Sequence, residues 1–399
     1  MTVVEYRINI PLMKKHKCKI ISLCLCFLIS IIETEIAVAQ VKNQQIQSCL
    51  RQGMEKALNL ETQSAIGFFN KAVELDREDP TGYAFLALAH LFFLEISYAP
   101  AERVRNRDSM LRYADEALAR GQKKIENDEK DGPAYFAMTL ATIVKVRWAI
   151  RQKSYFAMAH NTSTAWGYMQ KTQEINPQVY DIYFPIGLLH YHIDHLPGLA
   201  RFFSSLLITA GNKRQGIKEL ELVAQKGDLL KEVAQAELVS AFLYFEKQPA
   251  QALTIAMELK EKFPQNYNFA FALANTYSEL HRFTEALAIA RELHKNIQAG
   301  KPPYIPQLQP RYDILMGRIF FNQGEYAEAA EYLKRALEDN SLYNARNKAA
   351  ALLRLGMIHD IRQERKEAED CYSRVLEIEG GEGSAPIEAK KYLQAPYIR

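Results

Sequence analysis

Residues 252–293 read ALTIAMELKEKFPQNYNFAFALANTYSELHRFTEALAIAREL, and this stretch contains one pattern twice. Three small or apolar residues recur 34 residues further on, in the pairs Ala252 and Ala286, Ala256 and Ala290, and Leu259 and Leu293. A fixed period of this length is typical of one supersecondary unit that is copied along a chain. The sequence therefore predicts an array of repeats.

Within each unit the apolar residues lie three or four positions apart, which is the spacing of one face of a helix. Two such faces fit into one period, so each unit is expected to be a helical hairpin. Small residues are needed where its two helices cross, because close-packed interiors leave no room for larger side chains. Four neighbouring units keep this register, with marker residues Ser240, Leu243, Ala252, Ala256, Leu259 and Pro264; Ala274, Tyr277, Ala286, Ala290 and Leu293; Gly317, Phe320, Ala329, Leu333 and Ala336; and Gly356, Ala368, Tyr372 and Val375.

These units resemble the tetratricopeptide repeat, which has a small residue at position 8, an aromatic at 11, alanines at 20 and 27, and proline near 32. The resemblance implies an all-α fold, a right-handed α-solenoid of about eight helical hairpins. The run from Gly187 to Ile217, with its His-Tyr, Leu-Pro and Gly-Asn-Lys motifs, also resembles a group of exported bacterial tetratricopeptide proteins of unsettled function.

The register divides the chain into four predicted parts. Residues 1–39 are a signal peptide, and residues 40–298 are a tetratricopeptide-like solenoid with insertions near 96–108 and 197–211. Residues 299–310 are rich in proline and are expected to form a stiff linker. Residues 311–393 are a C-terminal pair of repeats followed by a capping helix.

Residues 1–39 have the order of a secretory signal peptide. Lysines precede an apolar run from Ile20 to Ile32, and Ala37-Val38-Ala39 supplies a cleavage site. We therefore expect export to the periplasm or cell envelope, with cleavage after Ala39. The run is too short for a comfortable membrane span, so no transmembrane segment is expected in the mature chain. Cys24 and Cys26 each follow leucine, where a lipid-attachment site needs a small residue, so no lipid anchor is expected.

The mature chain is nearly neutral and poor in cysteine. Residues 40–399 contain 45 basic and 44 acidic residues, a net charge of +1, which predicts no binding of nucleic acid. Cys49 and Cys371 lie in the first and last repeats, which an array holds far apart, so two buried thiols are expected and no disulfide. The sequence contains no G-x-S-x-G, H-E-x-x-H, Walker or G-x-G-x-x-G motif. We therefore expect neither an enzyme nor a bound cofactor.

One group of residues could bind a metal or take part in catalysis: His190, His192, Asp194 and His195. Three imidazoles and a carboxylate suit zinc, so a metal-dependent enzyme that uses His190, His192 and His195 is one alternative. On a helix, however, these side chains point in two directions. The repeat register favours packing histidines with one hydrogen-bonded ring nitrogen, because His90, His190 and His359 all occupy the aromatic position of a repeat.

The segment Pro197–Gly211 interrupts the fourth unit and is mainly apolar. Such a segment is expected to plug the groove or to cover a neighbouring repeat. Contact with a membrane is an alternative. A third interpretation makes the segment a lid over a small apolar or lipid ligand, which the protein would then carry.

The resemblance implies a non-catalytic scaffold or assembly factor of the cell envelope, which binds a protein or peptide on its concave face. That face is expected to include Glu237, Phe271, Asn275, Arg318 and Asn322. Some tetratricopeptide proteins clamp the C-terminal carboxylate of a chaperone with lysine, asparagine and arginine at five fixed positions. Those positions are here Phe271, Asn275, Leu315, Ala350 and Arg354, of which two match, so this clamp is not expected.

Overall fold

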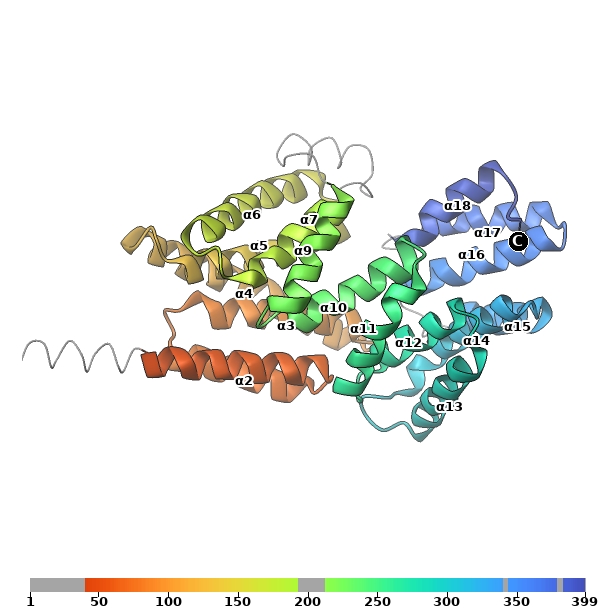
Figure 1. Cartoon of the computed structure of the whole chain (residues 1–399), viewed down its shortest axis with the longest axis horizontal. Coiled ribbons are helices and arrows are strands. Elements are labelled where there is room, and N and C mark those ends of the chain that lie inside the picture. Colours follow the sequence, from red (N-terminus) through yellow and green to blue (C-terminus); the bar gives the residue numbers. More distant parts are fainter. Residues whose placement is uncertain (1–39, 193–211, 340–343, 379–382, 399) are drawn as a thin grey trace, which may run out of the picture.

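The computed structural model describes residues 40–192, 212–339, 344–378 and 383–398. Every regular element among them is a helix, and successive helices pair as hairpins that stack on one another, those with α2 to α6 (residues 62–175) on the left and those with α12 to α18 (residues 267–394) on the right of Figure 1. The all-α solenoid that the repeat register predicts is therefore confirmed. The predicted signal peptide and the apolar segment 197–211 lie outside the described residues. None of the described helices is both long enough and apolar enough to cross a membrane.

The first four hairpins occupy the N-terminal half of the chain. They are residues 40–58 with α2 (Thr62–Leu75), α3 (Pro80–Ile96) with α4 (Pro100–Asn127), α5 (Gly132–Arg151) with α6 (Tyr155–Ile175), and α7 (Tyr183–His192) with α9 (Lys213–Lys226). The short helix η1 (Tyr180–Ile182) precedes α7. The insertion predicted near residues 96–108 is largely helical, because α4 already begins at Pro100.

The last four hairpins follow in the same order. They are α10 (Lys231–Ser240), extended by the π-helical turn η3 (Ala241–Phe245), with α11 (Pro249–Lys262); α12 (Tyr267–Glu279) with α13 (Phe283–Ala299); α14 (Gln309–Gln323) with α15 (Tyr326–Glu338); and α16 (Ala345–Ile361) with α17 (Arg365–Glu377). Helix α18 (Ser384–Gln394) packs on α16 and α17 at the end of the array.

Segment 299–310, which the sequence predicts to be a stiff spacer, packs against the array. It contains the short helix η4 (Pro306–Leu308), and Leu308 and Tyr304 are buried. The centre of the Tyr304 ring lies 6.0 Å from the centre of the Tyr267 ring. One apolar core therefore runs from the first hairpin through this segment into α14.

Small residues are needed where the two helices of a hairpin cross. A Cβ atom added at Gly317 would lie 2.7 Å from Leu333 Cγ, and one added at Gly356 would lie 2.6 Å from Tyr372 Cε1. Both distances are too short for unperturbed packing. The alanines of the repeat pattern serve the same purpose, since Ala252, Ala286 and Ala329 have no exposed surface.

Six of the hairpins share one turn. In each of them the residue two positions before the second helix has a positive φ, and these residues are Leu60, Lys153, Lys247, His281, Gly324 and Gln363. Glycine occupies this left-handed conformation without strain, whereas other residues adopt it less readily. Gly324 is the only glycine among the six, so the array imposes the conformation on five residues that do not favour it.

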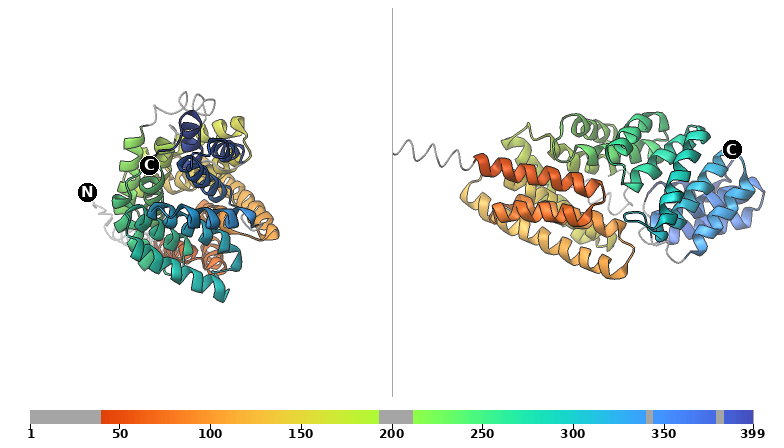
Figure 2. Two further views of the ribbon diagram at one scale, coloured as in Figure 1. Left: turned by 90° about the vertical axis from the view of Figure 1, so that its right-hand side faces the viewer. Right: turned by 90° about the horizontal axis from the view of Figure 1, so that it is seen from below.

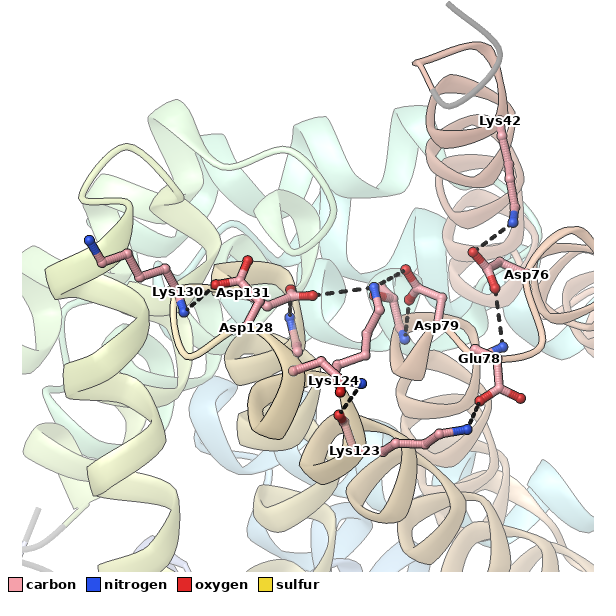
Figure 3. A network of polar contacts seen from close by, with 12 residues as sticks. Lys42, Asp76, Glu78, Asp79, Lys123, Lys124, Asp128, Lys130 and Asp131 are labelled. Atoms are coloured by element: carbon pink, nitrogen blue, oxygen red, sulfur yellow. Dashed lines mark hydrogen bonds and ion pairs between the residues drawn. The ribbon is translucent and has the colours of Figure 1, made fainter. Parts of the chain in front are cut away.

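Polar caps and ion pairs connect successive hairpins. Asp79 and Asp131 cap α3 and α5 by accepting hydrogen bonds from Thr81 N and Ala134 N. Figure 3 shows Lys124 between the two caps, and its Nζ lies 3.7 Å from Asp79 Oδ2 and 3.3 Å from Asp131 Oδ2. Burial would lower the pKa of Lys124, but the charges of these carboxylates raise it overall. One lysine thus links the starts of two successive first helices.

The first hairpin also contacts the middle of the array, far along the sequence. Asn266 Nδ2 donates a hydrogen bond of 2.6 Å to Leu58 O, and Arg51 makes two hydrogen bonds to the carboxylate of Asp228. Figures 1 and 2 show one end of the first hairpin next to α11 and α12. The solenoid therefore folds back on itself in its N-terminal half.

The crossing constraint predicts opposite effects for two glycine-to-alanine substitutions. Gly356→Ala places its methyl group against the Tyr372 ring, so it is expected to destabilise the protein by about 1–3 kcal/mol. Gly167 lies on an exposed face of α6, and a methyl group added there would have nothing within 4 Å, so Gly167→Ala is expected to stabilise the protein by up to about 1 kcal/mol. Chemical denaturation of both variants measures the two effects. Equal effects of the two variants would contradict the assigned register.

Candidate functional site

The first helices of the hairpins line the inner side of the array. Successive first helices α12, α14 and α16 contact one another, and no comparable contact joins the successive second helices α13, α15 and α17 among the described elements. The second helices are therefore spread further apart and lie on the outer side. A partner that binds along the inside of the array would meet side chains from the first helices.

The five residues predicted for this face have different surroundings. Phe271 is only 2% exposed, and the Arg311 guanidinium lies 4.3 Å from the centre of its ring. It belongs to the core, because the array curves tightly enough for α14 to cover it. Asn275 and Glu237 are half-buried, and Asn275 Nδ2 donates to Tyr244 Oη at 3.2 Å. The prediction of a partner-binding Phe271 does not fit this packing.

Arg318 and Asn322, in contrast, lie with Arg354 around the carboxylate of Glu279, at the end of α12. The Nη1 atom of Arg318 and the Nη2 atom of Arg354 both lie 3.7 Å from Glu279 Oε1. Asn322 Nδ2 donates to the same oxygen at 3.3 Å. We call Glu279, Arg318, Asn322 and Arg354 the inner-face cluster. Three first helices supply it, so it forms only when the hairpins stack.

The inner-face cluster is poorly exposed and carries one more positive than negative charge. The side chains of Arg318 and Arg354 are 9% and 13% exposed, and that of Glu279 is 30% exposed. Burial and the neighbouring charge of Arg318 lower the pKa of Arg354 to about 10. Burial would raise the pKa of Glu279, but Arg318 and Arg354 lower it overall, helped by Asn322 and Lys247. Arg354 and Glu279 are therefore both ionised at neutral pH.

Residues from two distant parts of the chain lie at the border of the cluster. Tyr244, at the end of η3, has its ring centre 5.2 Å from the Arg318 guanidinium. Lys247, in the following turn, pairs with Glu388 of α18 at 2.8 Å. This ion pair joins residues 141 positions apart in the sequence. It brings the fifth hairpin and the capping helix together beside the cluster.

The five-position carboxylate clamp is not formed. Phe271 and Leu315 are buried apolar residues, and Asn275 is hydrogen-bonded to Tyr244. Arg354 lies instead against Glu279, which has no counterpart in the clamp pattern. The inner-face cluster therefore differs from the clamp in residue types and positions.

The histidines of the predicted metal site are engaged in packing. His190 Nδ1 lies 2.7 Å from Glu219 Oε2, while the ring of His192 packs against Tyr191 and Phe245. His90 is likewise hydrogen-bonded to Asn106, and His359 to Glu364. Asp194 and His195 lie outside the described residues, among which no group of three or more histidine, cysteine or acidic residues is arranged to hold a metal. The described part of the chain gives the metal-enzyme alternative no support.

Both cysteines of the predicted mature chain are free and buried, as the sequence predicts. Burial raises the pKa of the Cys371 thiol to about 11, so this thiol is un-ionised at neutral pH. Neither cysteine belongs to the inner-face cluster. Their role is packing in the first and last hairpins.

Comparison with known proteins identifies the same kind of repeat. Residues 314–338, from within α14 to the end of α15, match the family model for the tetratricopeptide repeat. No curated protein matches the chain. The predicted tetratricopeptide character is confirmed for the hairpin that supplies Arg318 and Asn322.

Solved structures of repeat proteins resemble the chain only distantly. It is similar to a thermophilic tetratricopeptide repeat protein of Thermus thermophilus, with 16% identity and a TM-score of 0.36, over 58% of this chain and 98% of that one. It is also similar to a tetratricopeptide repeat protein of Parabacteroides merdae, with 13% identity and a TM-score of 0.33, over 77% of this chain and 98% of that one.

The inner-face cluster predicts a pH-dependent effect of Glu279→Gln. Glu279 has a lowered pKa in the folded protein, so its ionised form stabilises the fold above the unfolded pKa, and this stabilisation is lost as the pH falls through the folded value. At pH 7 the variant removes the carboxylate that both arginines approach, at 3.7 Å, and should be less stable by about 1–3 kcal/mol. Near pH 3, below the ordinary glutamate pKa of about 4.3, the difference in stability between the two proteins should be smaller than at pH 7, and it should vanish once the pH passes below the folded pKa.

Thermal unfolding of both proteins at the two pH values measures this convergence. Glu331→Gln is the matched control, because Glu331 is exposed on α15 and should have little effect at either pH. A loss of stability in Glu279→Gln that is equal at both pH values would show that the charge of Glu279 is not the cause.

Proposed function

We propose that this protein is a non-catalytic scaffold or assembly factor that binds a protein or peptide segment along the inner face of its array. The repeat architecture suggests a role in protein interaction, since stacked hairpins present an extended surface built from many first helices. The single observation that carries the proposal is the inner-face cluster. It gathers largely buried polar groups from α12, α14 and α16 on the side where a peptide would lie.

The charges on this face favour binding of a partner over catalysis. The pKa of Arg354 is about 10 and that of Glu279 is lowered, so neither of these two groups is poised to exchange a proton near neutral pH. Guanidinium and amide groups are suited to holding the polar groups of a bound chain in a defined position. The cluster would thus fix the register of a peptide that also contacts neighbouring first helices.

Site-specific photocrosslinking tests the proposed binding face. A photoreactive phenylalanine analogue in place of Asn275, on α12, is expected to crosslink to a discrete protein partner in cells of the native host. The same analogue in place of Glu331, on the outer helix α15, is expected to give no such product. Crosslinks of equal yield from both positions, or from Glu331 alone, would contradict binding on the inner face.

We also propose that the protein acts outside the cytoplasm. The support is the order of basic, apolar and small residues before Gln40, where the predicted cleavage leaves the mature chain. N-terminal sequencing of the protein from its native cells is expected to begin at Gln40. A mature chain that retains Ile20 to Ile32 would contradict cleavage at this site, and a lipid on Cys24 or Cys26 would make it an anchored protein.

A further inference from the structure

A surface hollow lies between the hairpin of α12 and α13 and the hairpin of α14 and α15. It has a volume of about 570 Å³ and is open to solvent. Phe283, at the start of α13, lines it together with four residues around the turn between α14 and α15: Phe320, Gln323, Glu325 and Glu328. We call these five residues the turn-edge pocket. None of them belongs to the inner-face cluster, so the pocket is distinct from it.

Two phenylalanine rings supply the apolar surface of the pocket. Both are half-buried, and each has a second ring beside it. The Phe320 ring stacks on Tyr332 of α15, and the Phe283 ring lies edge-to-face with His281, with ring centres 5.5 Å apart in both pairs. Because these neighbours hold the two rings, little ordering is needed before a ligand contacts them. The apolar area that they leave in water favours a ligand that covers it.

Two exposed acidic side chains supply the polar surface of the pocket. Within the described residues, the carboxylates of Glu325 and Glu328 make no hydrogen bond or ion pair. The positive end of the α15 dipole accounts for acidic residues at the start of this helix. It does not account for two phenylalanine rings in the same hollow. The pocket therefore combines negative charge with aromatic surface, and none of its five lining residues is a cation.

The array itself shows which chemical group suits this combination. The Arg335 guanidinium lies 4.5 Å from the centre of the Tyr332 ring and pairs with Asp313 at 2.6 Å. The Arg282 guanidinium lies 4.7 Å from the centre of the Tyr277 ring and pairs with a carboxylate of α13 at 2.6 Å. Each guanidinium is thus held by an aromatic ring and a carboxylate together. The turn-edge pocket offers the same two kinds of group without the arginine.

From this correspondence we propose that the turn-edge pocket binds an arginine side chain of a protein partner. A guanidinium group is planar, so it can lie against a phenyl ring while its N–H groups donate paired hydrogen bonds to a carboxylate. A cation over the face of an aromatic ring is also attracted by the charge distribution of the ring. The ammonium group of lysine is compact and strongly hydrated, so it fits this surface less well.

This inference goes beyond the proposed function. It places a contact at the turns of two hairpins, outside the inner-face cluster, and it does not depend on binding along the inner face. It also assigns a chemical class to one residue of the partner.

Fluorine NMR tests this assignment on the full mature chain. A 4-fluorophenylalanine in place of Phe320 alone reports on the pocket, and the same label in place of Phe92, on α3, reports on non-specific effects. The probes are the capped residues N-acetylarginine amide, N-acetyllysine amide and N-acetylcitrulline amide, titrated at constant ionic strength. Citrulline has nearly the shape of arginine without its charge.

The arginine probe is expected to shift the resonance of the label at Phe320 to saturation and to bind more tightly than the lysine probe. The citrulline probe is expected to give no saturable shift. The label at Phe92 should not respond to any of the three probes.

Three variants, each carrying the label at Phe320, connect the shift to the pocket. The double substitution of Glu325→Gln and Glu328→Gln is expected to weaken binding of the arginine probe on the order of three- to tenfold, since exposed ion pairs are individually weak. Glu331→Gln removes an exposed charge from the same helix outside the pocket, and it should bind normally. Phe283→Leu keeps an apolar side chain without the aromatic ring and should also weaken binding of the arginine probe.

Four results would overturn the inference. They are no saturable shift with the arginine probe, equal binding of the citrulline probe, equal binding of the lysine probe, and unchanged binding of the arginine probe in the double variant. Free arginine separates a partner's side chain from a small molecule, because its α-ammonium and α-carboxylate groups are absent from a residue within a peptide. It is expected to bind no more tightly than the capped probe, and clearly tighter binding would contradict a site for a protein partner.

Discussion

The close approach of the two helices in each hairpin is the constraint on which the rest of this structure depends. Where α14 crosses α15, Gly317 leaves no space for a side chain beside Leu333, and the same holds at Gly356 beside Tyr372. Because the helices are this close, consecutive first helices can also contact one another and line the inside of the array. The meeting of Arg318, Arg354 and Glu279 is a consequence of that stacking, since each comes from a different hairpin.

The fold could be predicted from sequence because this constraint requires particular residue types at a fixed spacing along the chain. Glycine and alanine recur at crossing positions, and the helices between them form hairpins of the expected kind. The turn that six hairpins share has no comparable pattern in the sequence. Only Gly324 reveals the left-handed residue before a second helix, whereas His281, Gln363 and Lys247 adopt the same conformation because stacking outweighs their own preference. Local chemistry therefore could not show that six turns are alike.

The candidate site was predictable only in part, for a related reason. The register placed Arg318 and Asn322 on a first helix, but it could not show that Phe271 is covered by Arg311, because that contact depends on the curvature between hairpins. Glu279 and Tyr244 lie at the ends of first helices, outside the positions that the repeat pattern marks. The pair of Lys247 and Glu388 depends on the sum of several small rotations between repeats, which no local pattern specifies.

The same curvature determines how much of the inner face is free to bind a partner. In the N-terminal half, Arg51 and Asn59 attach the first hairpin to the middle of the array, so part of the interior is filled by the chain itself. In the C-terminal half, Lys247 and Glu388 hold two hairpin ends together beside the inner-face cluster. The cluster is thus held in place by contacts that do not use its own donors.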